Sequence, residues 1–253
     1  MTNIVSIHSY RGGTGKSNVT ANLSAVLAKS GKRVAVVDTD IQSPGIHVLF
    51  GFDDEDIQTS LNDYVWGKLP ISQVSYDVTR VLGQAKTSST GQLYLVPSST
   101  STEDIARVLR EGYDIEYLSE GLQALAEELN LDYLLIDTHP GLNEETLLSI
   151  TISDTLVLIL RPDSQDYQGT AVTVEVSRKL QVPQMFMLVN KVPTAFDLDE
   201  LKVKVEETYN VGVAGLLPHS DEMMMLASSG LFTVQYPDHE LNQVFESVAR
   251  QIL

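Results

Sequence analysis

Glycines, a lysine and a serine follow an apolar run near the start of the chain and could bind phosphate. The run IVSI at residues 4–7 precedes YRGGTGKS at residues 10–17. Glycines let the backbone approach phosphate oxygens, lysine neutralises the β- and γ-phosphates, and a serine hydroxyl can ligate Mg²⁺. The segment therefore predicts a nucleotide-binding loop made of these residues: Gly12, Gly13, Thr14, Gly15, Lys16 and Ser17.

The loop departs from the usual phosphate-binding pattern at its first position. The pattern G-x-x-x-x-G-K-[ST] asks for glycine at position 10, where this chain has Tyr10 followed by Arg11. An ordinary glycine-rich turn is the alternative reading. The position between an apolar strand and the amphipathic stretch SNVTANLSAVLAKSG favours the phosphate loop, because a helix N-terminus then points at the anion.

Carboxylates follow two other apolar runs. RVAVVDTDIQSPG contains Asp38 and Asp40, and YLLIDTHPG contains Asp137. Strands of a parallel sheet end at the same edge, so these side chains are expected beside the phosphate loop, where a magnesium ion and a water need ligands. The alternative for the first pair is that the two carboxylates only cap the following turn.

The elements that must position these residues alternate between short apolar runs and longer amphipathic stretches. We expect strands at 3–8, 33–38, 92–97, 132–137, 155–161, 184–190 and 213–218. We expect helices at 16–30, 103–111, 114–130, 143–152, 165–180, 197–209, 221–229 and 239–252. The segment 41–90 is less regular, with a short helix in SLNDYVWGK and a polar loop in GQAKTSSTGQ. The fold predicted is α/β: a doubly wound, mostly parallel sheet flanked by helices, as one domain over residues 1–253.

Composition narrows the function classes. The chain has 253 residues, 43% of them hydrophobic, and a formal net charge of -17, so it should repel nucleic acid and anionic lipid unless cations cluster locally. It has no cysteine, which excludes cysteine-ligated zinc and iron–sulfur clusters. The N-terminal MTNIVSIHS lacks signal-peptide features, and no apolar run suits a membrane span. We expect a cytoplasmic protein, with association with the nucleoid left open.

Together these segments resemble the ParA/MinD superfamily of deviant Walker A ATPases, from about Ile4 to Gly230. That resemblance implies a P-loop NTPase fold, ATP/ADP and Mg²⁺ as cofactors, and a homodimer with ATP sandwiched between the subunits. The family's loop has a second lysine before the double glycine, which reaches the partner subunit's phosphates. Arg11 holds that position here, and a solvated loop cation is its alternative reading.

The resemblance also implies roles for individual residues. Catalytic roles fall to Asp40, which would position the attacking water, and to Lys16 and Arg11. Metal-binding roles fall to Ser17, Asp38 and Asp137, with Asp38 supporting the magnesium shell. Gly141 occupies the place of a glycine that senses the γ-phosphate. Asn190, at the end of LVNKV, would contact the adenine edge, and Pro218 would flank the base. His139 is expected to be a loop residue without a metal role, and Met223–Met225 to be helix core.

Two functions from different classes remain open on the sequence. The first is an ATP-dependent dimerisation switch that positions or partitions DNA or protein cargo, such as carboxysomes, through an adaptor protein that stimulates slow hydrolysis of ATP to ADP and phosphate. The alternative is an ATP-coupled small-molecule enzyme of the dethiobiotin-synthetase-like type. The C-terminal HELNQVFESVARQIL has too few cations for MinD-like membrane binding. Weak DNA binding is expected only if second-half cations converge: Arg161, Arg178, Lys179, Lys191, Lys202 and Lys204.

Overall fold

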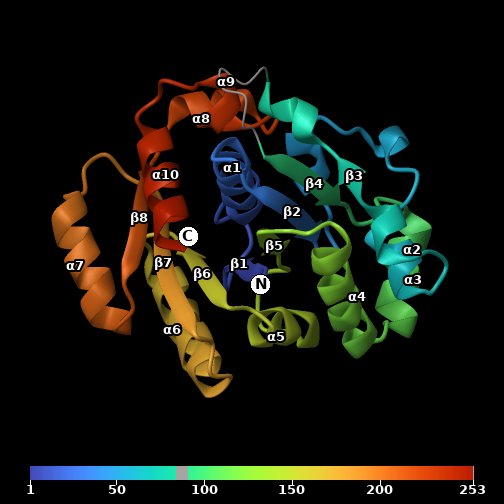
Figure 1. Ribbon diagram of the computed structural model, residues 1–253. Helices are drawn as coiled ribbons and strands as arrows, with labels where there is room; N and C mark the ends of the chain where they lie inside the picture. The colour runs from blue at the N-terminus through green and yellow to red at the C-terminus, as the bar shows by residue number, and fades with distance from the viewer. Residues whose placement is uncertain (84–90, 253) are drawn as a thin grey trace.

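The computed structural model describes residues 1–83 and 91–252, and its strands form one eight-stranded sheet (Figure 1). The strands are β1 (Asn3–His8), β2 (Arg33–Asp38), β3 (Tyr76–Asp77), β4 (Gln92–Val96), β5 (Tyr133–Asp137), β6 (Thr155–Leu160), β7 (Gln184–Val192) and β8 (Val213–Pro218). Their order across the sheet is β3-β4-β2-β5-β1-β6-β7-β8. Only the β3–β4 pairing is antiparallel, and the other six are parallel.

Helices cover both faces of the sheet (Figure 1). The α-helices are α1 (Lys16–Lys29), α2 (Leu61–Val65), α3 (Thr102–Glu111), α4 (Ile115–Glu128), α5 (Glu144–Thr151), α6 (Ser164–Lys179), α7 (Leu198–Tyr209), α8 (Asp221–Leu226), α9 (Phe232–Gln235) and α10 (Leu241–Ile252). Short 3-10 helices span Ile46–Phe50, Asp54–Asp56, Ile71–Val74 and Thr79–Leu82. The helices α1, α9 and α10 pack on one face, and α2, α4, α6 and α7 pack on the other.

The alternation of side chains along each strand explains why two cores form. In β2, Val34 and Val36 point to the α1 side, whereas Ala35 and Val37 point to the α4 side. Successive strand residues face opposite sides of a sheet, so a strand buried on both faces must be apolar throughout. This is the reason that the short apolar runs predict a doubly wound parallel sheet, and the structure confirms that fold class.

The predicted elements agree with the structure to within a few residues at most ends. The short helix expected in SLNDYVWGK is α2, while β3 and α9 were not predicted, since each spans four residues or fewer. Most of the predicted polar loop GQAKTSSTGQ lies outside the described residues.

The expectation that Met223–Met225 form helix core was wrong for two of the three residues. Helix α8 ends at Leu226 rather than at residue 229, and Met224 and Met225 are 63% and 73% exposed. Met223 alone packs against the core on the α1 side. A six-residue helix cannot bury three consecutive side chains, because neighbouring positions point in different directions around its axis.

Sheet topology places the predicted site. Strand β1 lies between β5 and β6, while the chain leaves β1 towards β2 on the opposite side of β5. The order of connection therefore reverses beside β1, and ligands of open α/β sheets bind outside the carboxyl ends of strands at such a point. Lys16 begins α1 directly after the loop that follows β1, Asp40 lies just beyond the end of β2, and Asp137 ends β5.

Candidate nucleotide site

The loop between β1 and α1 has the conformation of a phosphate cradle. Gly13 and Gly15 adopt positive φ angles of 77° and 94°, a region that residues with a side chain rarely adopt. Helix α1 begins directly afterwards, and its first backbone bond runs from the Val19 N–H to the Gly15 carbonyl at 3.0 Å. A cavity of about 230 Å³ lies over this N-terminus, lined by Ser9, the loop from Gly12 to Asn18, Asp40 and Pro140.

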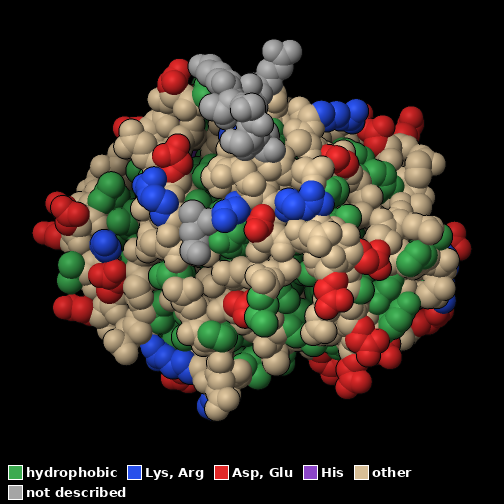
Figure 2. All heavy atoms as spheres, in the orientation of Figure 1, with side chains coloured by type: hydrophobic (Ala, Val, Ile, Leu, Met, Phe, Trp, Pro, Cys, Tyr) green, Lys and Arg blue, Asp and Glu red, His purple; other side chains and the backbone are tan. Residues whose placement is uncertain are grey.

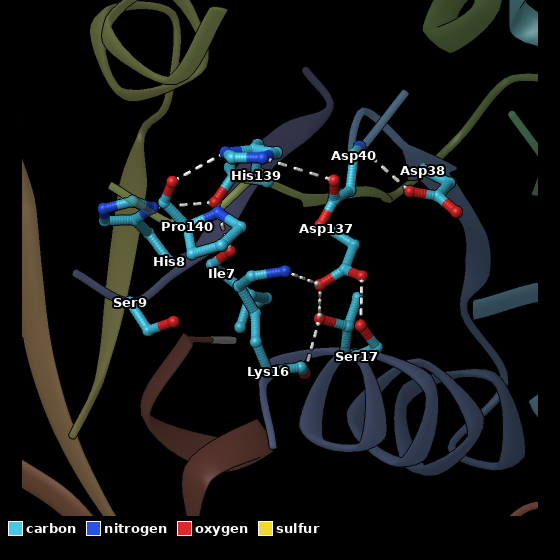
Figure 3. Close-up of polar contacts among 12 residues, drawn as sticks. Ile7, His8, Ser9, Lys16, Ser17, Asp38, Asp40, Asp137, His139 and Pro140 are labelled. Atoms are coloured by element: carbon cyan, nitrogen blue, oxygen red, sulfur yellow. Dashed lines mark hydrogen bonds and ion pairs between the residues drawn. The ribbon is translucent and has the colours of Figure 1, made fainter. Parts of the chain in front are cut away.

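Asp137 lies beneath the loop and joins three side chains of α1 (Figure 3). Its Oδ1 atom is 3.3 Å from the Lys16 Nζ atom and accepts a hydrogen bond of 3.0 Å from the Thr20 hydroxyl. Its Oδ2 atom accepts a bond of 2.6 Å from the Ser17 hydroxyl. Lys16 is 7% exposed and Asp137 is buried, so the Lys16–Asp137 ion pair holds the lysine at the floor of the cavity, which it helps to line.

Two further carboxylates follow β2 and point in different directions. The fully buried Asp38 accepts backbone hydrogen bonds from Asp40 at 3.0 Å and from Gly45 at 3.3 Å. Burial, with the negative charges of Asp137 and Asp40, raises the pKa of Asp38 to about 8. Burial also raises the pKa of Asp40, against the opposing effects of Lys16 and His139. Asp40 is the carboxylate that lines the cavity, and Asp38 supports the loop behind it.

His139 contacts Asp40, which the sequence did not predict. Its Nε2 atom is 3.8 Å from the Asp40 Oδ1 atom, and its Nδ1 atom is 2.6 Å from the Pro140 carbonyl (Figure 3). Neighbouring His8 is buried and bonds the Thr138 hydroxyl at 2.8 Å; burial lowers its pKa to about 3. His8 therefore stays neutral at physiological pH, and His139 is the imidazole that can face the Asp40 carboxylate.

Asn190 lies under the phosphate loop because strand β7 has a bulge at this point. The β7–β8 register shifts between Val189 and Val192, and Lys191 adopts a positive φ of 55°. The Asn190 side-chain amide donates to the Thr14 carbonyl at 2.7 Å, and the Lys191 ammonium donates to the Gly13 carbonyl at 2.9 Å. Both residues therefore brace the loop, and a base contact of Asn190 stays a prediction.

Pro218 ends β8 opposite Val192, so it lies at the same sheet edge as Asn190. It does not line the cavity above the phosphate loop but a separate groove beside β8. Its expected place next to the base stays a prediction.

Arg11 lies outside the cavity lining. Its guanidinium donates to the Gln165 side-chain oxygen and is 3.8 Å from Asp166 and 4.0 Å from Asp163, at the start of α6. Arg11 is thus a partly exposed loop cation that is also paired within its own subunit. Its action on a partner subunit stays a prediction.

The residues present fit a magnesium ion. Ser17 and Asp137 supply a hydroxyl and a carboxylate, the hard oxygen ligands that Mg²⁺ prefers together with phosphate and water. Three carboxylates here share one nearby ammonium, and the negative charges of Asp137 and Asp40 add to burial in raising the pKa of Asp38. No group of three or more acidic or histidine side chains among residues 1–83 and 91–252 has metal-binding geometry. A magnesium ion at this site would thus rely on nucleotide phosphates for its remaining ligands.

The structure brings together most of the predicted residues and adds three that were missed. Lys16, Ser17, Asp40 and Asp137 converge with the loop glycines, whereas Arg11 and Pro218 lie apart. Thr20, Lys191 and Gln165 were missed. Four-residue spacing from Lys16 on one helix face could have indicated Thr20, but Lys191 and Gln165 reach the loop only through folding.

Comparisons with known proteins show the family to which the chain belongs. A family profile described as an AAA domain matches residues 2–186. An uncharacterized ATP-binding protein of Methanocaldococcus jannaschii is 29% identical over 251 residues, covering 98% of this chain and 87% of that protein. The septum site-determining protein MinD of Bacillus subtilis is 24% identical over 263 residues, covering 100% and 90%.

A solved structure with the same fold was also found. MinD from Pyrococcus horikoshii, complexed with Mg-ADP, superimposes with a TM-score of 0.80 at 22% identity, covering all of this chain and 96% of that one. None of the described helices is long and apolar enough to cross a bilayer. The phosphate loop, the acidic strand ends and the family match lead to one conclusion: the chain belongs to the AAA-domain family and to the ParA/MinD superfamily of P-loop ATPases.

Proposed function

We propose that this protein is an ATP-dependent dimerisation switch that hydrolyses ATP to position cargo through an adaptor protein. The observation that carries the proposal is the shared cavity of the phosphate loop and Asp40, with the Lys16–Ser17–Asp137 cluster directly beneath it. This arrangement offers a cradle for the phosphates and a carboxylate facing them.

The residues divide the work of phosphoryl transfer. Backbone N–H groups from Gly12 to Ser17 would hold the phosphates, and Lys16 would leave Asp137 to neutralise the β/γ oxygens. Ser17 and Asp137 would hold Mg²⁺, which would supply charge neutralisation when bound. Asp40 would orient the attacking water at the cavity wall.

Dimerisation would complete the site. Positioning and electrostatic stabilisation supply most of the catalysis in phosphoryl transfer, and a cation delivered by a second subunit is an effective way to add them. Arg11 is a permanent cation with a bidentate fork, and it precedes the loop in the chain. A partner's Arg11 at the phosphates would make hydrolysis depend on the dimer. ATP binding would then form the dimer, and hydrolysis would end it.

Light scattering and calorimetry on three variants test this function. The parent should be monomeric without nucleotide and dimeric with Mg·ATP. Lys16→Ala should lose ATP binding, because the charge at the β/γ-phosphates is gone. Asp40→Ala should dimerise with ATP yet hydrolyse it poorly, because it removes only the group that orients water. Lys202→Ala, on the exposed face of α7, is the control and should behave as the parent. Unchanged ATP affinity in Lys16→Ala would rule out the phosphate-loop assignment.

A further inference from the structure

Arg11 is docked on the first turn of helix α6 in its own subunit. The guanidinium bonds the Gln165 side chain, and its Nη1 atom is 3.8 Å from the Asp166 Oδ1 atom. Asp163, the N-cap residue of α6, lies 4.0 Å from the same Nη1 atom. The side chain is 40% exposed and lies outside the lining of the phosphate cavity. Arg11 is therefore held away from its own nucleotide site while part of its side chain stays in contact with solvent.

Asp166 gives this contact an energetic reason. Its side chain is 2% exposed, and its Oδ2 atom accepts bonds from the Arg161 backbone N–H at 3.0 Å and from Arg161 Nε at 3.1 Å. Its Oδ1 atom is buried and has no hydrogen-bond partner among the described residues. Burying a carboxylate oxygen without a bond is costly, so a cation at ion-pair distance from Oδ1 stabilises it. That cation is Arg11.

Tyr10 holds the same segment on the same helix. Its ring lies against Gly169, where any Cβ atom would overlap the ring carbons. Glycine inside a helix is otherwise unfavourable, so its presence at this place is explained by the close approach of the tyrosine. Tyr10 departs from the ordinary phosphate-loop pattern and Arg11 departs from the lysine of the ParA/MinD loop, and both residues pack on α6.

We propose that Asp166 and Gln165 are positioning residues for Arg11, which hold it in its own subunit and must release it before two copies can share ATP. This inference rests on the proposed function for its consequence, namely that the contact raises the ATP concentration needed for dimerisation. The docking itself is a property of the nucleotide-free monomer and can be measured without nucleotide.

Replacing Arg161 should affect the docking of Arg11 in the opposite direction from replacing Asp166 or Gln165. Its Nη2 atom is 3.2 Å from Asp163, and its Nε atom contacts Asp166, so it shares both carboxylates with Arg11. Removing the Arg161 charge leaves more negative charge facing Arg11 and should tighten the docking. A set of variants can therefore both weaken and strengthen the contact between Arg11 and α6.

The first measurement follows Arg11 directly in the nucleotide-free monomer. Phenylglyoxal modifies free guanidinium groups, and peptide mass spectrometry gives the rate at Arg11. Asp166→Asn removes an ion pair of the partly exposed Arg11, and Gln165→Ala removes a hydrogen bond to it, so each should raise that rate about two- to fivefold. Arg161→Gln should lower the rate at Arg11, and Asp199→Asn, which changes an exposed first-turn carboxylate of α7, should leave it unchanged.

Gln165 is exposed, so the Gln165→Ala variant should fold even if Asp166→Asn does not. Equal rates in parent and Gln165→Ala would overturn the docking.

The second measurement takes the ATP midpoint of dimerisation, each change being placed in the Asp40→Ala background to stop hydrolysis. The ATP concentration at the midpoint should fall with Asp166→Asn and Gln165→Ala and rise with Arg161→Gln. The order of the midpoints should follow the order of the modification rates. Changed rates with an unchanged midpoint would overturn the regulatory role while leaving dimerisation intact. A background protein that never dimerises with ATP would instead reject the proposed function, and the modification rates would still decide the docking.

Discussion

Asp38 shows how the acidic site affects the stability of the empty protein. Burial and two neighbouring carboxylates raise its pKa to about 8, from the ordinary aspartate value of 3.8. Between these two pH values the folded chain binds more protons than the unfolded chain, so the free energy of unfolding falls as pH rises through this window. The stabilising effect of the protonated form is fully present below the lower value and lost above the higher one.

We therefore predict that Asp38→Asn stabilises the nucleotide-free protein at pH 8. The amide mimics the protonated carboxyl group, so the unfolding temperature should exceed that of the parent by at least about 2 °C at pH 8. The difference should shrink towards pH 4. Scanning calorimetry at the two pH values checks this, with the exposed Asp238→Asn as control. A variant less stable than the parent at both pH values would show that the two backbone hydrogen bonds to Asp38 outweigh its charge.

The phosphate loop depends on two glycines for different reasons. Gly13 and Gly15 both have positive φ angles, but nothing lies within 4 Å of a Cβ atom placed on Gly13. A Cβ atom on Gly15 would overlap the Asn190 side-chain amide. Replacing Gly13 therefore costs backbone strain alone, and replacing Gly15 costs strain together with a collision.

We predict that Gly15→Ala weakens ATP binding much more than Gly13→Ala. The strain common to both is worth about 1–2 kcal/mol, or roughly a tenfold effect. Only Gly15→Ala must also displace Asn190 and the loop that it braces, so calorimetry should find a further loss. Circular dichroism should show both variants folded. Equal affinities in the two variants would mean that the Asn190 contact does not shape the site.

The sequence could predict the elements and the centre of the site because both depend on local patterns. The apolar runs ending at Asp38 and Asp137 indicate strands, and Lys16 and Ser17 indicate the start of a helix. Other features depend on contacts between distant segments. The bulge at Lys191 aims Asn190 at the loop, and Tyr10 fits Gly169, yet neither position carries a local signal. The prediction that the methionines of α8 are buried fails for the same reason, because burial depends on what packs against a helix.

At the scale of the whole molecule, net charge and its distribution bear on which partner the proposed switch could contact. The net charge is -17, and several second-half cations are already paired within the protein. Arg161 bonds Asp163 and Asp166, Arg178 donates to the Tyr209 carbonyl, and Lys191 bonds the phosphate loop. In the view of Figure 2 the basic side chains are scattered among acidic ones. A protein adaptor is thus a more fitting partner than DNA for a single subunit.

Shared sites are the central claim, and mixing two inactive variants tests it. An Arg11→Ala subunit keeps Asp40 but lacks the cation that its partner needs. An Asp40→Ala subunit keeps Arg11 but cannot orient water at its own site. In a mixed dimer the first subunit's site would regain everything from its partner.

The decisive measurement is the ATPase rate of each variant alone and of an equal mixture. If Arg11 acts across the interface, the mixture should hydrolyse ATP faster than the sum of its parts. Its rate should reach up to about a quarter of the parent's, since half of the dimers are mixed and each has one complete site. A mixture no faster than that sum, with mixed dimers identified by native mass spectrometry, would show that Arg11 serves its own subunit and that the sites are not shared.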